Sequence, residues 1–206
     1  MPTPDGPRWL LLIHQLPKEP AYLRVKIGRR LGRVGAVALK SSVYVLPRRD
    51  GTIEDFEWVR NEIVAGGGEA TIVEAHLVSG LADDEVEARF REAKDAEYAT
   101  LLGEADAIEV EPRGRRKRPL TDDEQQAARS ALERITQRMD DAATTDFFDA
   151  PLRGVLAARL HELAAKLEPE KPSIGVPEAV LGVVGGTWVT RSGIHIDRIA
   201  SAWLIR

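Results

Sequence analysis

The sequence predicts an α+β fold, with a small domain of strands and helices first and a mainly helical region after it. Two patterns carry this prediction. Within the first 80 residues, short apolar or alternating runs typical of strands are interleaved with two segments of helical spacing. From residue 83 onward, apolar residues recur every three or four positions over long stretches, which predicts helices. With 206 residues, of which 43% are hydrophobic, the chain can bury a sizeable core.

The first 80 residues are expected to form strand, helix, strand, strand, helix and strand, in that order. The strands are predicted at 9–13, 36–40, 43–46 and 70–78, and the helices at 21–34 and about 53–63. The runs 9–13 and 43–46 are the most uniformly apolar, so we expect them at the centre of the sheet. Lys40 and Glu74 mark the other two strands as edges. This order is that of a ferredoxin-like βαββαβ domain.

The remaining elements are predicted to be helices at 83–102, 121–139 and 152–167. Thr121 with Glu124 three residues later has the spacing of a capping box. We therefore expect a ferredoxin-like domain at 1–80, a helical region at 81–168 with a basic linker at 112–120, a second linker at 169–186, and the start of another domain at 187–206. Because an apolar-periodic run continues to Arg206 without a cap, the sequence is expected to be truncated there.

Composition excludes several classes of protein. The chain has no cysteine, so it has no disulfide, no thiolate zinc site and no cysteine nucleophile. It shows no signal peptide and no apolar run long enough for a membrane helix, which predicts a cytoplasmic protein without a membrane partner. The net charge of −4 hides strong segregation, because residues 1–60 and 112–120 each carry a surplus of five bases. Because of these local basic patches, the negative net charge does not exclude a nucleic-acid partner.

Two basic clusters are the candidate DNA-binding residues, since phosphate contacts need concentrated cations. An ordinary solvated surface, or a soluble linker in the second case, is the alternative interpretation. The first cluster comprises Arg24, Lys26, Arg29, Arg30, Arg33, Lys40, Arg48 and Arg49, and the second comprises Arg113, Arg115, Arg116, Lys117 and Arg118.

Other polar groups are weaker candidates. If His14, Glu74 and His76 shared an open sheet face they would converge on a divalent metal, but packing of that face is the favoured interpretation, and no metal or cofactor is predicted. No catalytic motif is present. Near the end of the chain, two guanidiniums and an imidazole have the chemistry to hold an oxyanion, with helix-start chemistry as the alternative. That group comprises Arg191, His195, Asp197 and Arg198.

Three stretches resemble the ChrB family of chromate-resistance proteins. They are 9–17 (WLLLIHQLP), 39–47 (LKSSVYVLP) and above all 187–206, which contains HIDRIASAWLIR. The resemblance implies a transcriptional regulator of a chromate-efflux operon that binds promoter DNA through its N-terminal region and responds to chromate. It also places the four C-terminal candidates within the matched motif, in a domain that continues beyond Arg206 in the family.

We expect such a regulator to be a homodimer formed through the sheet, matching a two-fold operator, and not an enzyme. Two alternatives stay open. One is an enzyme of chromate detoxification, such as a reductase, although no flavin or nicotinamide motif is present. The other is a protein-interaction module built on the long helices.

Overall fold

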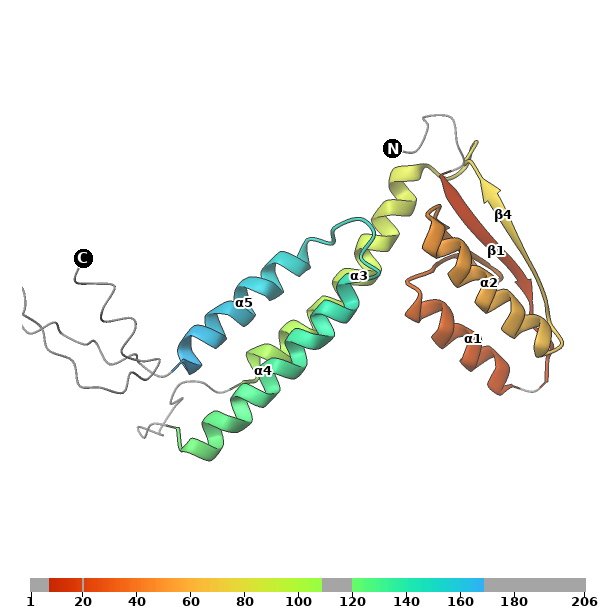
Figure 1. Ribbon diagram of the computed structural model, residues 1–206. Coiled ribbons are helices and arrows are strands. Elements are labelled where there is room, and N and C mark those ends of the chain that lie inside the picture. The colour runs from red at the N-terminus through yellow and green to blue at the C-terminus, as the bar shows by residue number, and fades with distance from the viewer. Residues whose placement is uncertain (1–7, 20, 109–119, 169–206) are drawn as a thin grey trace, which may run out of the picture. The chain divides into compact units, whose positions relative to one another are not determined.

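A four-stranded sheet organises the first part of the chain (Figure 1). The computed structural model describes residues 8–19, 21–108 and 120–168. The strands are β1 (Trp9–Gln15), β2 (Val37–Lys40), β3 (Val43–Pro47) and β4 (Glu69–Ala75). Their spatial order is β2-β3-β1-β4, and each neighbouring pair is antiparallel. The first and third strands are therefore central, as the sequence predicts, and the α+β class is confirmed.

Two helices, α1 (Tyr22–Arg33) and α2 (Asp50–Ala65), lie on one side of this sheet (Figure 1). Side chains alternate along a strand, so Leu10 and Leu12 share the face that packs into the first core. The helices complete this core with Leu23, Ile27, Leu31, Phe56, Val59 and Ile63. On the opposite face of the sheet, Ile13 and Val73 are 44% and 38% exposed.

Three long helices follow, α3 (Asp83–Asp106), α4 (Asp122–Ala143) and α5 (Leu152–Leu167). All three predicted helices are confirmed, and α3 continues four residues beyond its predicted end because Ala105 still packs in a buried position. The predicted capping box is also confirmed. Thr121 Oγ1 accepts a hydrogen bond from the Glu124 amide at 3.3 Å, and Glu124 Oε2 accepts one from the Thr121 amide at 2.9 Å.

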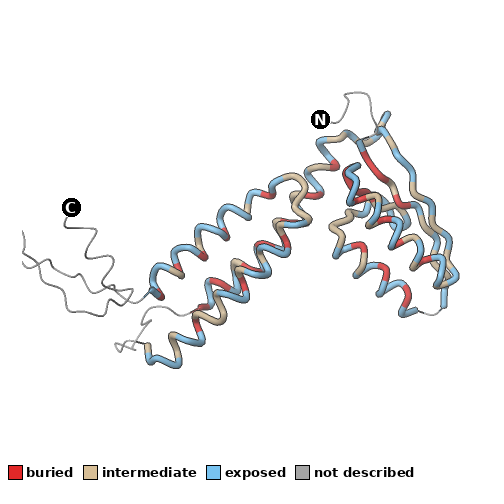
Figure 2. Tube along the Cα trace, viewed as in Figure 1, coloured by how far each residue is buried: buried red, intermediate tan, exposed pale blue. Residues whose placement is uncertain are grey.

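The described residues form two cores that share one helix. The N-terminal part of α3 supplies Val86 and Phe90 to the core of the sheet, and its later part supplies Tyr98 and Leu101 to the core between the three helices. Figure 2 shows buried positions in red both in the sheet with its helices and along the long helices. Both cores belong to one compact unit, residues 1–168. The domain boundary at residue 80 stays a prediction, and the segments 169–186 and 187–206 lie outside the described residues.

One local prediction about the sheet is wrong. The strand predicted at 70–78 ends at Ala75, so His76 lies beyond it. In the observed register His14 is opposite Ala70, whereas Trp9 at the other end of β1 is opposite Ala75. The two imidazoles therefore belong to opposite ends of the sheet and do not converge. Among the described residues no group of three or more His, Asp or Glu side chains is arranged to hold a metal ion.

Candidate nucleic-acid interface

The first helix displays its basic residues because its apolar residues fall on a single stripe. Leu23, Ile27 and Leu31 recur every four positions and are buried against the sheet and α2. The helix carries five basic residues and no acidic one, and all five lie off that stripe. Four of them are exposed and Arg30 is half-buried. Burial of the stripe thus leaves a basic surface towards solvent.

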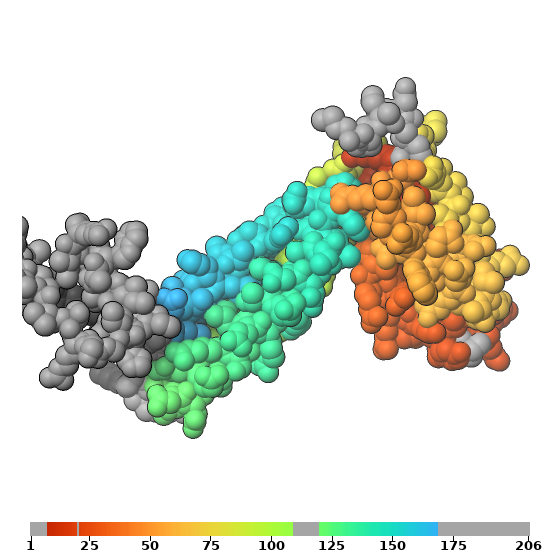
Figure 3. Space-filling model, viewed as in Figure 1, coloured from red at the N-terminus to blue at the C-terminus, as the bar shows by residue number. Residues whose placement is uncertain are grey.

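The five cations are distributed over two sides of α1. Arg24 lies towards the turn between β2 and β3, where it lines an open pocket with His14, Ser41 and Ser42. Arg29, Arg30 and Arg33 line a groove between α1 and α2, together with Lys26 and Tyr22. The surfaces of α1 and α2 adjoin on the face shown in Figure 3. The groove side holds the greater concentration of positive charge.

Acidic residues on α2 neutralise part of this surface. Lys26 Nζ lies 2.7 Å from Glu62 Oε1, and this hydrogen bond and ion pair raise the pKa of Lys26. Arg30 is close enough to Asp55 to oppose the rise that burial causes in the pKa of that carboxyl. Among the described residues, Arg24, Arg29 and Arg33 form no ion pair. No carboxylate in this part of the structure neutralises these three guanidiniums, so they are available to an anionic ligand.

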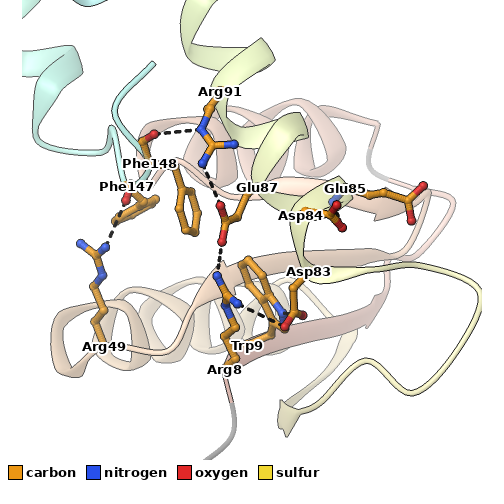
Figure 4. A network of polar contacts seen from close by, with 10 residues as sticks. All are labelled: Arg8, Trp9, Arg49, Asp83, Asp84, Glu85, Glu87, Arg91, Phe147 and Phe148. Atoms are coloured by element: carbon orange, nitrogen blue, oxygen red, sulfur yellow. Dashed lines mark hydrogen bonds and ion pairs between the residues drawn. The ribbon is translucent and has the colours of Figure 1, made fainter. Parts of the chain in front are cut away.

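The remaining members of the first basic cluster have separate positions. Lys40 is exposed on the edge strand β2. Arg48 Nε lies 2.8 Å from Glu74 Oε1 and is paired across the sheet. Arg49 donates a hydrogen bond to the Phe147 carbonyl oxygen at 3.2 Å, and its guanidinium lies 5.2 Å from the centre of the Phe147 ring (Figure 4). Arg49 therefore joins α2 to the turn between α4 and α5.

That contact belongs to a larger joint between the sheet and the long helices (Figure 4). The Trp9 ring stacks on Phe90 with their centroids 6.1 Å apart, and Trp9 Nε1 donates to Asp83 Oδ1 at 2.6 Å. Arg8 pairs with Asp83 and Glu87, and Arg91 bridges Glu87 and the Phe148 carbonyl. These contacts join the start of α3 to β1.

His14 is held in the pocket beside Arg24. Its ring stacks on Tyr44 with centroids 5.7 Å apart, and neither ring nitrogen has a hydrogen-bond partner among the described residues. Burial lowers the pKa of His14, since loss of water disfavours the charged imidazolium. The lowered pKa favours the neutral imidazole, so His14 contributes little positive charge to this surface.

Several predicted residues fall outside the part of the chain that the structure describes. The second basic cluster, Arg113 to Arg118, belongs to 109–119, and the oxyanion candidates Arg191, His195, Asp197 and Arg198 belong to 169–206. Their assignments stay predictions.

Sequence reasoning overlooked the aromatic side chains of this surface. Trp58 on α2 is 67% exposed and Tyr22 on α1 is 66% exposed. A signal was present, because Trp58 does not fit the helical spacing of Phe56, Val59 and Ile63, which form the buried stripe of α2. Exposed aromatic rings beside unpaired arginines are typical of surfaces that bind nucleic acids.

Comparisons with known proteins agree with the resemblance in the sequence. The family model described as "Protein ChrB, N-terminal" matches residues 24–171, which is more than half of the chain. The chain belongs to the ChrB family. It is also 26% identical to Protein ChrB of Cupriavidus metallidurans over 219 aligned positions, covering all of this chain and 63% of that relative's length.

The matched family region begins at Arg24 and so includes most of α1, the whole of α2 and the three long helices. No solved structure matches the chain. None of the described helices has the length and apolar character needed to cross a lipid bilayer.

Proposed function

We propose that this ChrB-family chain is a chromate-responsive transcriptional regulator that binds promoter DNA through the basic surface of α1. The observation that carries the proposal is the set of unpaired guanidiniums Arg24, Arg29 and Arg33 on one helix without acidic residues. Each phosphate that such a cation neutralises releases counterions, which supplies affinity at moderate salt. Family membership supports an association with chromate resistance.

The proposal includes the form of the sheet and the oligomer. We infer that residues 9–75 form a ferredoxin-like unit, because their element order is βαββαβ and β1 and β3 are central. Ile13 and Val73 are partly exposed on the sheet face away from α1 and α2, and they support a homodimer formed there. A two-fold dimer would present two α1 surfaces to a two-fold operator.

Within this proposal the protein is cytoplasmic, acts by binding and performs no catalysis. Chromate is its effector, and the cluster Arg191, His195, Asp197 and Arg198 is the candidate sensor. Binding of chromate to this cluster would change the affinity for DNA only if the DNA-bound and DNA-free states differ in their affinity for chromate.

The test is fluorescence anisotropy of the chain with its own upstream duplex DNA. We expect binding that weakens steeply with salt and is weakened or altered by chromate, while sulfate at the same ionic strength has no effect. Affinity equal to that for random DNA at every salt concentration would contradict recognition of promoter DNA, and the absence of salt-dependent binding would contradict DNA binding through α1. Specific binding that is indifferent to chromate would refute chromate sensing by this chain alone.

A further inference from the structure

An exposed tryptophan lies beside the basic groove without a ring partner. Trp58 is 67% exposed, whereas Trp9 is fully buried. Among the described residues, no aromatic ring stacks on Trp58 and no guanidinium covers it, although Trp9, Phe147 and Phe148 each have such contacts. An exposed indole offers a flat apolar face on which a planar ligand can stack.

The indole lines an open pocket of about 520 Å³ between three elements. Arg30 and Arg33 reach it from α1, Asp55 and Trp58 from α2, and Thr144 and Thr145 from the turn that follows α4. Asp55 and Trp58 are three residues apart and therefore share one face of α2. The volume falls within the range of about 300–1,000 Å³ that is usual for small-ligand sites.

The polar groups of the pocket divide into donors and acceptors. Arg30 and Arg33 only donate, and their charges suit a phosphate. Asp55 accepts, and burial raises the pKa of its carboxyl while Arg30 opposes that rise. Thr144 and Thr145 donate their hydroxyl protons to the Asp141 and Ala142 carbonyls at 2.7 and 3.4 Å, which leaves their oxygens as acceptors.

We propose that this pocket binds a nucleotide whose base carries an exocyclic amino group. The base would stack on Trp58, its amino group would donate to Asp55, and its phosphate would lie against Arg30 and Arg33. Cytosine, adenine and guanine carry such an amino group. Thymine and uracil have a carbonyl oxygen, which a carboxylate repels, in place of the amino group of cytosine, and they offer Asp55 only the ring N3–H. The ligand is either a free mononucleotide or an unpaired nucleotide of a DNA strand, since both present this chemistry.

The inference does not depend on duplex binding by α1, because a nucleotide can occupy the pocket of a chain that binds no duplex. The two are distinguishable. Nucleotide binding without duplex binding would remove the proposed function and leave this site. Duplex binding with no nucleotide effect at Trp58 would remove this site and leave the proposed function.

The experiment measures tryptophan fluorescence of the full chain, with a Trp58→Phe variant supplying the background of the other tryptophans. Cytidine monophosphate, uridine monophosphate, cytidine and inorganic phosphate are titrated separately. An oligo-dC strand and an oligo-dT strand follow. We expect quenching by cytidine monophosphate or oligo-dC, weaker quenching by the uracil or thymine counterpart, and little by cytidine or phosphate alone. Quenching by the mononucleotide identifies a free nucleotide as ligand, and quenching by the strand alone identifies an unpaired nucleotide of DNA.

Calorimetric titrations of three variants complete the test. Trp58→Ala should weaken binding about 5- to 150-fold, the range for loss of one base–aromatic stack. Asp55→Asn should retain affinity but lose the preference for cytosine, since an amide both donates and accepts. Val64→Ala is the matched control, because Val64 is exposed on the same helix but does not line the pocket.

Three results would overturn the inference. The first is the absence of quenching by every nucleotide and strand. The second is equal affinity of the Trp58→Ala and Val64→Ala variants. The third is binding of inorganic phosphate as tight as that of cytidine monophosphate, which would indicate a simple anion site.

Discussion

The cations of α1 and those of the long helices differ in what they contact. Along α3, α4 and α5, several arginines pair with acids on the same or a neighbouring helix, as Arg159 does with Asp106 at 2.7 Å and Arg138 does with Glu104. Arg89 and Arg134 are exposed and form no ion pair among the described residues. On α1, Arg29 and Arg33 form no ion pair within the described part of the chain. Part of the charge in the helical region therefore joins helices, whereas on α1 the unpaired arginines lie together on one helix and are available to a ligand.

This difference teaches that pairing, and not the number of cations, distinguishes a binding surface from a structural one. Exposed ion pairs contribute little to the free energy of unfolding. A guanidinium that already pairs with a carboxylate also contributes less to the binding of an anion, because its charge is partly neutralised. An unpaired arginine cluster repels itself and is stabilised only when an anion approaches. The two regions are nevertheless joined through α3, which belongs to both cores.

The largest expected effect concerns that joint. Phe90→Ala removes a ring that stacks on Trp9 and contacts Phe147 and Phe148, and it should lower the free energy of unfolding by about 3–5 kcal/mol. Leu163→Ala in the second core is the matched variant, with an expected loss of about 2–5 kcal/mol. In urea titrations followed by circular dichroism, both variants should keep a single transition. Separate transitions for the two regions would contradict a shared helix that couples them.

A smaller effect distinguishes the helical core at high pH. Tyr98 is buried there and donates to Asp146 Oδ2 at 3.2 Å, and burial together with the Asp146 charge raises its pKa to about 12. An unfolded tyrosine ionises near pH 10, so the unfolded chain loses its proton first and stability falls between about pH 10 and 12. Tyr98→Phe should remove this fall, measured by urea midpoints at pH 9 and 11. The exposed Tyr22→Phe should retain it, and identical profiles for the two variants would exclude Tyr98 as its source.

The Lys26–Glu62 pair tests whether an acid on α2 limits the basic surface. Glu62→Gln removes the partner of Lys26, so DNA affinity should rise and the slope of log K against log salt should steepen by up to about 0.9. Glu57→Gln is the control with the same change of charge on the same helix, because Glu57 pairs with Arg60 and not with α1. Anisotropy titrations on duplex DNA measure both. An equal gain in the two variants would mean that net charge alone is responsible.

The smallest effect concerns His14 at low pH. The pKa of His14 is lowered in the folded state. As the pH is lowered through about 6.5, the unfolded chain therefore takes up a proton before the folded chain does. The free energy of unfolding decreases as the pH is lowered, until the pKa of the folded state is passed. His14→Phe keeps a ring on Tyr44 and should reduce this acid sensitivity between pH 7.5 and 5.5 in urea midpoints. The exposed His161→Ala serves as control. Undiminished acid sensitivity of His14→Phe would show that His14 titrates normally in the folded chain.

The sequence predicts the elements well because their signals are local. The stripe of α1, the capping box at Thr121 and the α5 helix follow from side chains a few residues apart. The register of β1 against β4 depends on pairing between segments more than fifty residues apart, so the sequence alone could not decide between convergence of His14 and His76 and the favoured alternative.

The candidate site was predictable only in part for the same reason. The basic residues of α1 are visible in the sequence, but the pairing of Lys26 with Glu62 and the contact of Arg49 with Phe147 require tertiary structure. The pocket at Trp58 needs three elements that are distant in the chain, and only the poor fit of Trp58 to its helix stripe hinted at it.

The central claim is that the arginines on the groove side of α1 form the DNA interface. The most direct measurement compares the salt dependence of duplex binding for two triple variants with the same change of charge. Arg29→Ala/Arg30→Ala/Arg33→Ala removes bases from α1, and Arg89→Ala/Arg134→Ala/Arg138→Ala removes exposed bases from the long helices. We predict that the first variant binds more weakly and that its slope of log K against log salt flattens by up to about 3, while the second retains the original slope. Equal slopes in the two variants would contradict the claim.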